Sequence, residues 1–283
     1  MANAVFALST GRCSTQFLAK VLADALPDAL VEHEPIGAAY LPRKIFRRPA
    51  QVLRVLGGSV PLQRKLIQIE DLLADGRTYI DTGWPTYAWV PYLETRFGDR
   101  LRFLHIVRNP FATAASLLTH GLFAGAGKGL ARHALIYGTD PGILHSEFRA
   151  DYAGFSPFEK CLLHWIEVNA FLHEQRERAG SLGLVRFEDV YGGEASGVQD
   201  VAESLAGQSL PPIPTQPFDR YQKKLDGDLR LTHPDLAEVA IGLAVTLGYD
   251  EADLRATFDL ETIAAQYGKL RHERAKPGRR RKA

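Results

Sequence analysis

Short apolar runs alternate along the chain with longer stretches in which apolar residues recur every three or four positions. The short runs are rich in branched residues, as buried strands are, and they lie at 4–8, 29–33, 78–81, 101–107 and 182–187. The longer stretches have helical periodicity, and they lie at 14–25, 43–75 with a break at 57–59, 86–97, 110–119, 156–178, 195–206, 234–247 and 259–270. This alternation predicts an α/β fold with a mainly parallel central sheet and helices on both faces.

The first predicted strand ends in a polar turn before a helix begins, and this arrangement suits an anion. The turn reads Ser9-Thr10-Gly11-Arg12-Cys13-Ser14-Thr15-Gln16. The first N–H groups of a helix have no partner within it, and the helix dipole favours negative charge there. Arg12 adds a positive charge, and the hydroxyl groups add donors. A plain structural turn is the alternative, because glycine and serine are favoured in turns and caps.

The turn lacks the pattern of a magnesium-dependent nucleotide triphosphatase. It has one glycine where the Walker sequence has two, Arg12 stands in place of lysine, and no Lys-Ser or Lys-Thr pair is present to hold magnesium. A P-loop-like nucleotide kinase or NTPase is therefore disfavoured. It stays an alternative function, as does a non-catalytic protein that binds phosphonucleotides.

A second polar segment follows the strand predicted at 101–107. Arg108 stands at the carboxyl end of that strand, and Asn109-Pro110 ends it and begins a helix. Ser116 lies eight residues after Arg108, about two turns along that helix. Open α/β sheets bind ligands at the carboxyl ends of their strands. We therefore expect Arg108 and the first turn to face one crevice, with Ser116 reaching it from the helix.

These two segments, in this order, resemble the sulfotransferases that use 3′-phosphoadenosine 5′-phosphosulfate (PAPS). The turn at Ser9–Thr15 is similar to the loop that holds the 5′-phosphosulfate in that family, and Arg108-Asn109-Pro110 with Ser116 is similar to its 3′-phosphate motif. Residues 184–190 resemble a late strand of the family. The similarity therefore extends in patches from residue 4 to about residue 190.

The resemblance implies a three-layer, P-loop-like fold and a sulfotransferase that uses PAPS as co-substrate and no metal. It implies that PAPS is bound by Arg108, Ser116 and the turn residues Thr10, Gly11, Arg12, Cys13, Ser14, Thr15 and Gln16. By analogy with phosphoryl transfer, the acceptor and the leaving oxygen lie roughly in line across the transferred group. Arg12 and the loop amides then stabilise the departing bisphosphate.

Two residues, Ser14 and Phe187, depart from the family pattern, whereas Arg12 in place of lysine is common among some of its members. Ser14 stands where the family usually has glycine, and serine is the poorer choice if that position has a positive φ. Phe187 replaces a common tyrosine and loses little besides the hydroxyl. Arg12 in place of lysine keeps the positive charge but presents a planar fork of donors instead of a compact ammonium group.

The acceptor must lose a proton, so a general base is expected near the transferred group. Glu34 ends the second predicted strand, and the resemblance implies that it is this base. Because Pro35 follows, we expect Glu34 to be extended. His33 is the competing base, because neutral imidazole titrates near working pH. A solvated strand end without a catalytic role is the third interpretation.

The strand predicted at 78–81 contributes candidates for binding the acceptor. Asp81, Thr82 and Trp84 lie at its end, at the same rim of the sheet as the first turn. A simple structural turn explains these residues equally well. The acceptor itself is a hydroxyl or amine of a small molecule or glycan, and the sequence does not identify it, because fold does not fix function at that level.

The 283 residues are enough for one large α/β domain, which we expect at 1–268. Within it, 120–157 is glycine-rich and long for a connection, as lids and substrate-binding segments often are. Residues 269–283 carry eight Lys or Arg and one Glu, a charge of +7 that leaves −6 for the rest of the chain. A flexible tail is expected there, and it is the only hint of nucleic-acid binding, which is disfavoured.

Membrane and disulfide signals are weak in this sequence. No apolar run reaches the ~20 residues that span a membrane, and the N-terminus lacks the pattern of a signal peptide. The two cysteines, Cys13 and Cys161, provide no disulfide framework. We therefore expect a cytoplasmic protein without a membrane span.

Overall fold

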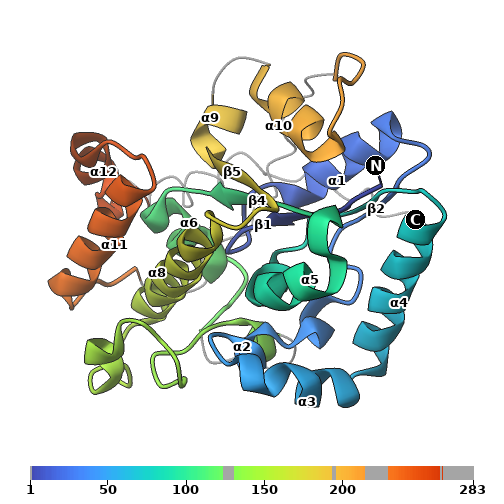
Figure 1. The fold of residues 1–283 in the computed structure, drawn as a ribbon. Helices are drawn as coiled ribbons and strands as arrows, with labels where there is room; N and C mark the ends of the chain where they lie inside the picture. Colours follow the sequence, from blue (N-terminus) through green and yellow to red (C-terminus); the bar gives the residue numbers. More distant parts are fainter. Residues whose placement is uncertain (1, 124–130, 193–195, 214–228, 262, 264–283) are drawn as a thin grey trace, which may run out of the picture.

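The computed structural model describes residues 2–123, 131–192, 196–213, 229–261 and 263 (Figure 1). The tail predicted at 269–283 and most of the helix predicted at 259–270 lie outside the described residues. Across the described ranges, no helix combines the length and the apolar character needed to cross a membrane.

A five-stranded sheet with the order β2-β3-β1-β4-β5 forms the centre of the molecule. β1 (Ala4–Leu8) lies between β3 (Tyr79–Asp81) and β4 (Leu101–Val107), and β2 (Leu30–Glu32) and β5 (Ser181–Arg186) lie at the two edges. Every pair of neighbouring strands is parallel. The carboxyl ends of the strands therefore share one edge of the sheet, where all the polar segments predicted from the sequence begin.

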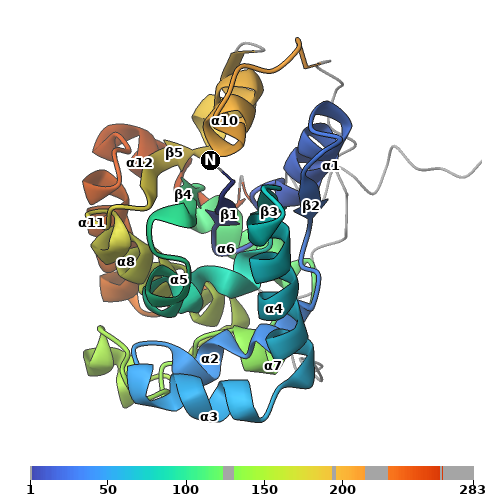
Figure 2. The same ribbon diagram turned by 45° about the vertical axis from the view of Figure 1, so that its right-hand side comes forward.

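Helices connect the strands and cover the sheet. Their bounds are α1 (Thr15–Ala25), α2 (Pro42–Ile45), α3 (Val52–Gly57), α4 (Val60–Ala74), α5 (Val90–Phe97), α6 (Pro110–Leu118), α7 (Ala131–Ala134), α8 (Pro157–Gln175), α9 (Phe187–Tyr191), α10 (Ser196–Ala206), α11 (Pro234–Thr246) and α12 (Glu251–Thr257). Figures 1 and 2 show α1 and α10 on one side of the sheet and α4 and α5 on the other.

The residues of β1 point alternately into two different clusters, which explains why both faces of the sheet are covered. Ala4, Phe6 and Leu8 pack in a cluster with residues of α4 and α5. Val5 and Ala7 pack in a cluster with residues of α1 and α10. All residues of β1 are buried, as expected of a parallel strand with helices on both faces. The predicted α/β fold with three layers is confirmed.

Prolines change the form of the helix predicted at 86–97. Residues Trp84–Trp89 form a 3-10 helix, and α5 follows it. Pro85 and Pro91 each stand in the first turn of their own helix, where a missing N–H leaves no donor unsatisfied. α12 has no counterpart in the sequence prediction, although Asp250 caps its N-terminus.

Candidate functional site

The turn between β1 and α1 follows an unusual backbone path. Gly11, Arg12 and Ser14 have positive φ values of 82°, 64° and 55°. Ser14, the N-cap of α1, is therefore in the left-handed conformation that glycine adopts more easily, and no side chain caps this helix end. The Phe17 N–H donates to the Ser14 carbonyl oxygen at 3.1 Å within the first turn. A helix start without a side-chain cap suits an anion that approaches along the helix axis.

The arginine and serine predicted from the two separate segments are in direct contact. Arg12 Nε donates a hydrogen bond of 2.9 Å to Ser116 Oγ, and the two residues are 104 positions apart. Arg108 Nη1 donates a hydrogen bond of 2.8 Å to the carbonyl oxygen of Arg12. The structure therefore brings the first turn, the end of β4 and α6 together at one place.

The N-terminus of α6 differs from that of α1, because its own side chain closes it. Asn109 accepts hydrogen bonds from the backbone N–H groups of Phe111 and Ala112. The Phe111 and Ala112 N–H groups at the start of α6 therefore already have an acceptor. Arg108, just before this helix, is held by other residues. Its carbonyl oxygen accepts the indole N–H of Trp165 at 2.9 Å. Its Nε is buried without a hydrogen-bond partner among the described residues, so the guanidinium keeps an unused donor.

Phe187 and Glu188, which follow β5, contact Arg108 and its neighbour Asn109. The guanidinium of Arg108 lies 4.5 Å from the centroid of the Phe187 ring, so the replacement of tyrosine by Phe187 keeps the aromatic face that the cation contacts. Glu188 accepts hydrogen bonds from the backbone N–H of Asn109 at 2.9 Å and from the Tyr249 hydroxyl at 2.7 Å. Sequence reasoning gave Glu188 no role. Its place just beyond the end of a parallel strand, beside the end of β4, is the signal that could have identified it.

The predicted base lies at the end of β2, in a turn. Glu34 has a φ of +51°, so the expectation that it is extended was wrong, although extended backbone is what a following proline favours. Glu34 Oε1 lies 3.5 Å from Nε2 of His33, and Nδ1 of His33 lies 3.3 Å from Oγ1 of Thr82. Partial burial raises the pKa of Glu34 above its ordinary value, while His33 and Arg12 act in the opposite direction. The positive charge of Arg12 therefore favours the ionised form of Glu34.

The three residues predicted to bind the acceptor occupy different environments. Asp81 and Thr82 are fully buried, whereas Trp84 is partly exposed. Thr82 Oγ1 donates a hydrogen bond of 2.8 Å to the carbonyl oxygen of Thr15 and so joins the end of β3 to the start of α1. The Trp84 ring covers Gly11, where an added Cβ would lie 3.4 Å from it. Of the three, Trp84 alone presents surface to solvent beside the first turn.

The side chains of the first turn also differ in exposure. Thr10, Cys13 and Thr15 are buried, and Gln16 is exposed. Burial raises the pKa of Cys13 to about 12, so its thiol is neutral at physiological pH and does not act as a nucleophile. These buried residues would contribute backbone groups to an anion, whereas Arg12 would contribute its side chain.

Part of the predicted lid at 120–157 is fixed to the body. Asp140 accepts hydrogen bonds from both Nε and Nη2 of Arg43. On α8, Nδ1 of His164 accepts the backbone N–H of Ile136 at 3.0 Å, and Glu167 accepts the backbone N–H groups of Leu144 and His145. Residues 124–130 lie outside the described residues, so the lid stays a prediction.

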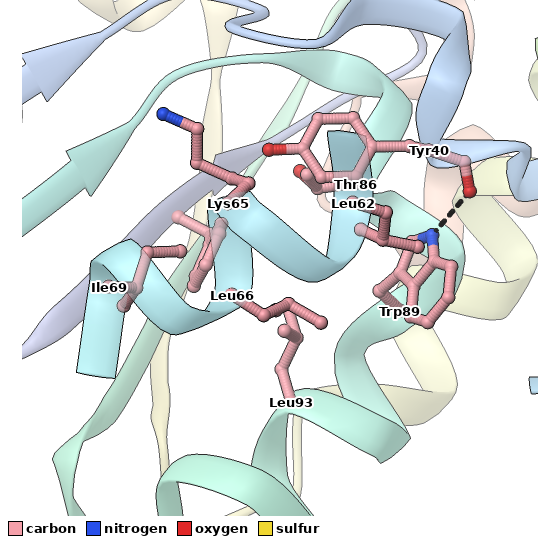
Figure 3. Close-up of a pocket in the computed structure, with 9 residues that line it drawn as sticks. Tyr40, Leu62, Lys65, Leu66, Ile69, Thr86, Trp89 and Leu93 are labelled. Carbon is pink, nitrogen blue, oxygen red and sulfur yellow. Dashed lines mark hydrogen bonds between the residues drawn. The ribbon is translucent and has the colours of Figure 1, made fainter. Parts of the chain in front are cut away.

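An apolar cavity lies between α4, α5 and the sheet (Figure 3). Leucine, isoleucine and aromatic side chains form most of its wall, with Lys65 and Thr86 as the polar members. None of the predicted site residues lines it. Within the described part of the chain, no group of three or more His, Cys, Asp or Glu side chains is arranged to hold a metal ion.

No protein-family model and no curated protein match this chain. Among solved structures it is similar to a sulfotransferase from Alicyclobacillus acidocaldarius, with a TM-score of 0.52 and 16% identity over 90% of this chain and 99% of that one. Two further similarities are to the sulfotransferase domain of the Synechococcus PCC 7002 olefin synthase (TM-score 0.47, 17% identity, 88% and 97% covered) and to that of the curacin biosynthetic pathway (TM-score 0.42, 16% identity, 95% and 98% covered). The first similarity shows that the chain has a sulfotransferase fold.

Proposed function

We propose that this protein is a sulfotransferase that moves the sulfuryl group of PAPS to a hydroxyl or amine of an acceptor. The observation that carries the proposal is the contact of Arg12 with Ser116 and of Arg108 with the Arg12 carbonyl. Two segments that would each bind one phosphate of a nucleotide meet at the carboxyl edge of a parallel sheet, where such folds bind ligands.

The two groups of donors have separate roles in this proposal. The uncapped start of α1 and the side chain of Arg12 bind the 5′-phosphosulfate, and Arg108 and Ser116 bind the 3′-phosphate. Asn109 and Glu188 hold Arg108 in place through the backbone. Arginine suits these positions, because its planar fork of donors matches phosphate oxygens.

The transfer needs a base and a stabilised leaving group. The acceptor oxygen or nitrogen forms a bond to sulfur as the bond from sulfur to the 5′-phosphate oxygen breaks, and the acceptor proton passes to Glu34. The released bisphosphate keeps the electron pair of the broken bond, and Arg12 stabilises its charge. His33, 3.5 Å from Glu34, is the alternative base. The raised pKa of Glu34, caused by its burial, makes it a better proton acceptor than an ordinary carboxylate.

The acceptor is proposed to bind beside Trp84, which is partly exposed and covers Gly11. A flat indole face suits a sugar ring, an aromatic ring or an aliphatic chain, so the class is left open as a small molecule or glycan. We further propose a cytoplasmic location. Both cysteines are free and buried, in keeping with a reducing compartment.

A thermal-shift titration followed by a transfer assay tests the proposal. We expect adenosine 3′,5′-bisphosphate without magnesium to raise the Tm, since a ligand at 100 times its Kd adds ~2.7 kcal/mol of stability. Radiolabelled PAPS is then supplied with a mixed panel of hydroxyl and amine acceptors, and a labelled product is expected. Stabilisation by ATP with magnesium alone would instead support a kinase or NTPase. Binding of the bisphosphate without transfer would support a non-catalytic nucleotide-binding protein.

A further inference from the structure

We propose that Asp81 is a positioning residue that, together with Gly83, holds the Glu34 turn so that the Glu34 carboxylate faces the acceptor; this inference rests on the proposed function. It assigns to Asp81 a role different from the acceptor contact expected from the sequence.

The backbone of Glu34 needs support from its surroundings. Its φ of +51° lies in the left-handed region, which is uncommon for a residue with a side chain. Such conformations persist where the neighbouring structure determines them. Within the turn itself, the Gly37 N–H donates a hydrogen bond of 3.0 Å to the Glu34 carbonyl oxygen. This bond fixes the end of the turn and leaves its beginning to be held by another element.

Gly83 lies directly against the beginning of this turn. A Cβ added at Gly83 would lie 2.9 Å from both the backbone nitrogen and the Cα of Glu34, and 2.8 Å from Asp81 Oδ1. The φ of −86° and ψ of 123° at Gly83 are ordinary for any residue. Glycine is therefore required here by the close approach of two chain segments and not by its own backbone conformation.

The carboxylate of Asp81 joins the segments that meet at this point. Oδ1 accepts the backbone N–H of Gly83 at 2.7 Å, and Oδ2 accepts the hydroxyl of Tyr40 at 2.8 Å. Asp81 is 0% exposed. Burial raises the pKa of Asp81 to about 7, against the hydrogen bonds from Tyr40 and from the backbone of Gly83 and Glu34. A fully buried carboxyl group with both oxygens engaged acts through its neighbours, not on the acceptor.

Tyr40 is itself fixed at both ends. Its backbone carbonyl accepts the indole N–H of Trp89 at 2.8 Å, shown as the dashed line in Figure 3. Its ring lines the apolar cavity beside Leu62 and Leu66 of α4. The hydroxyl therefore reaches Asp81 from a rigid side chain, and the order of contacts runs from Trp89 through Tyr40 and Asp81 to the Glu34 turn.

The first variant to test is Gly83→Ala, with Gly58→Ala as its matched control. The added methyl at Gly83 displaces the Glu34 turn, and a displacement of about 1 Å lowers kcat on the order of 100-fold. An added Cβ at Gly58 would lie 3.5 Å from the nearest atom, an ordinary contact, so kcat is expected to stay within about twofold. The Kd for adenosine 3′,5′-bisphosphate is expected to stay within about twofold in both variants. The nearest atoms to the added methyl belong to Glu34 and Asp81 at Gly83, and to Arg54 and Val55 at Gly58. An unchanged kcat in Gly83→Ala, or an equal loss of nucleotide affinity, would overturn the proposal.

A second pair of variants keeps the test valid if Gly83→Ala does not fold. Tyr40→Phe and Tyr87→Phe each remove one buried hydroxyl, which donates to Asp81 in the first case and to the carbonyl oxygen of Ala134 in the second. The two changes remove hydrogen bonds of similar strength. We expect kcat to fall about fivefold or more in Tyr40→Phe and to fall less in Tyr87→Phe. Equal values of kcat in the two variants would contradict the proposed order of contacts.

A measurement that does not need turnover separates this inference from the proposed function. In protein labelled with ¹³C at the glutamate carboxyl groups, the Glu34 signal is identified by its loss in Glu34→Gln, and its titration is followed by NMR. We expect the Glu34 pKa to be above its ordinary value in the wild type and to shift in Gly83→Ala but not in Gly58→Ala. An unchanged Glu34 titration in Gly83→Ala overturns the positioning role. A shifted titration in a protein that transfers no sulfate to any acceptor retains the positioning role and rejects the proposed function.

Discussion

The phosphate corner (Arg12, Arg108 and Ser116) and the base corner (Glu34 with Asp81) are built in different ways. In the phosphate corner, side chains from distant segments contact each other directly, and Arg12 and Arg108 remain partly exposed. Both corners contain a residue with left-handed backbone, Arg12 in the first and Glu34 in the second. In the base corner, however, the residue that holds the turn, Asp81, is completely buried. The difference teaches that the two arginines are positioned by contacts between partly exposed groups, whereas the Glu34 turn is positioned by a buried carboxyl group.

The largest expected effect is on the base corner. Replacing Glu34 by Gln keeps the shape of the side chain but removes its capacity to accept a proton. We expect kcat to fall by roughly 100- to 10,000-fold, the range for loss of a general base, while the Kd for PAPS changes little. Sulfate transfer from labelled PAPS measures kcat, and calorimetry measures Kd. His33→Gln is the matched variant; a larger loss in His33→Gln than in Glu34→Gln would assign the base to His33.

The second effect is on the phosphate corner. Arg12→Ala removes a charged donor that is proposed to act on the leaving phosphate. We expect kcat to fall by ~100- to 1000-fold, a greater change than in KM for PAPS. Arg54→Ala, at an exposed position on α3, removes the same charge far from the sheet edge and is the control. A rise in KM with an unchanged kcat would show that Arg12 serves binding alone.

Arg108→Ala should have a smaller effect, confined to nucleotides that carry a 3′-phosphate. Loss of a charge-assisted hydrogen bond of ~1.5–3 kcal/mol weakens binding by roughly 10- to 100-fold. We expect this change in Kd for adenosine 3′,5′-bisphosphate and a change under about threefold for adenosine 5′-monophosphate. Ser116→Ala should act in the same direction with a smaller magnitude. Equal losses of affinity for the two nucleotides would contradict the assignment of Arg108 to the 3′-phosphate. They would also contradict its separation from Arg12, which is proposed to bind the 5′-phosphosulfate.

The smallest effect is on stability. Burial raises the folded-state pKa of Asp81 from 3.8 to about 7, so between these pH values the folded state holds a proton that the unfolded state has lost. The contribution of Asp81 to stability is therefore greatest at low pH and falls as the pH rises to about 7. Asp81→Asn removes this dependence.

Tm measurements from pH 5 to pH 8 check this expectation. The Tm of Asp81→Asn relative to the wild type should rise with pH, by about 2 °C or more over the range. Asp99→Asn, at an exposed position before β4, should show a flat difference. A flat difference for Asp81→Asn as well would mean that the buried carboxyl group is not protonated on folding.

The pattern of apolar residues along the chain was sufficient to predict the α/β fold. Continuous apolar runs such as Ala4–Leu8 are typical of parallel strands with helices on both faces, and the structure buries every residue of that run. Motif order was also sufficient to bring Arg108 and Ser116 to the first turn, because the carboxyl ends of parallel strands share one edge. The predicted roles of the site residues stay predictions, which the variants above test.

The contacts of buried residues could not be predicted from the sequence. Asp81 reads from the sequence as a polar residue at a strand end, and Glu188 lies in the segment 184–190 without a role of its own. Only the packing of β3 against the Glu34 turn, and of β5 against β4, engages their carboxylates with neighbours. The expectation of an extended Glu34 was wrong for the same reason, since local rules describe one residue and its proline but not the segment packed against them.

The sequence by itself determined the layered α/β architecture and the two polar segments, because both follow from local patterns and from the geometry of parallel strands. The tertiary structure alone decided which of these polar residues are exposed and which are buried beneath them. That distinction depends on hydrogen bonds between positions dozens of residues apart, such as Tyr40 with Asp81 and Arg12 with Ser116, and these form only when the chain is folded.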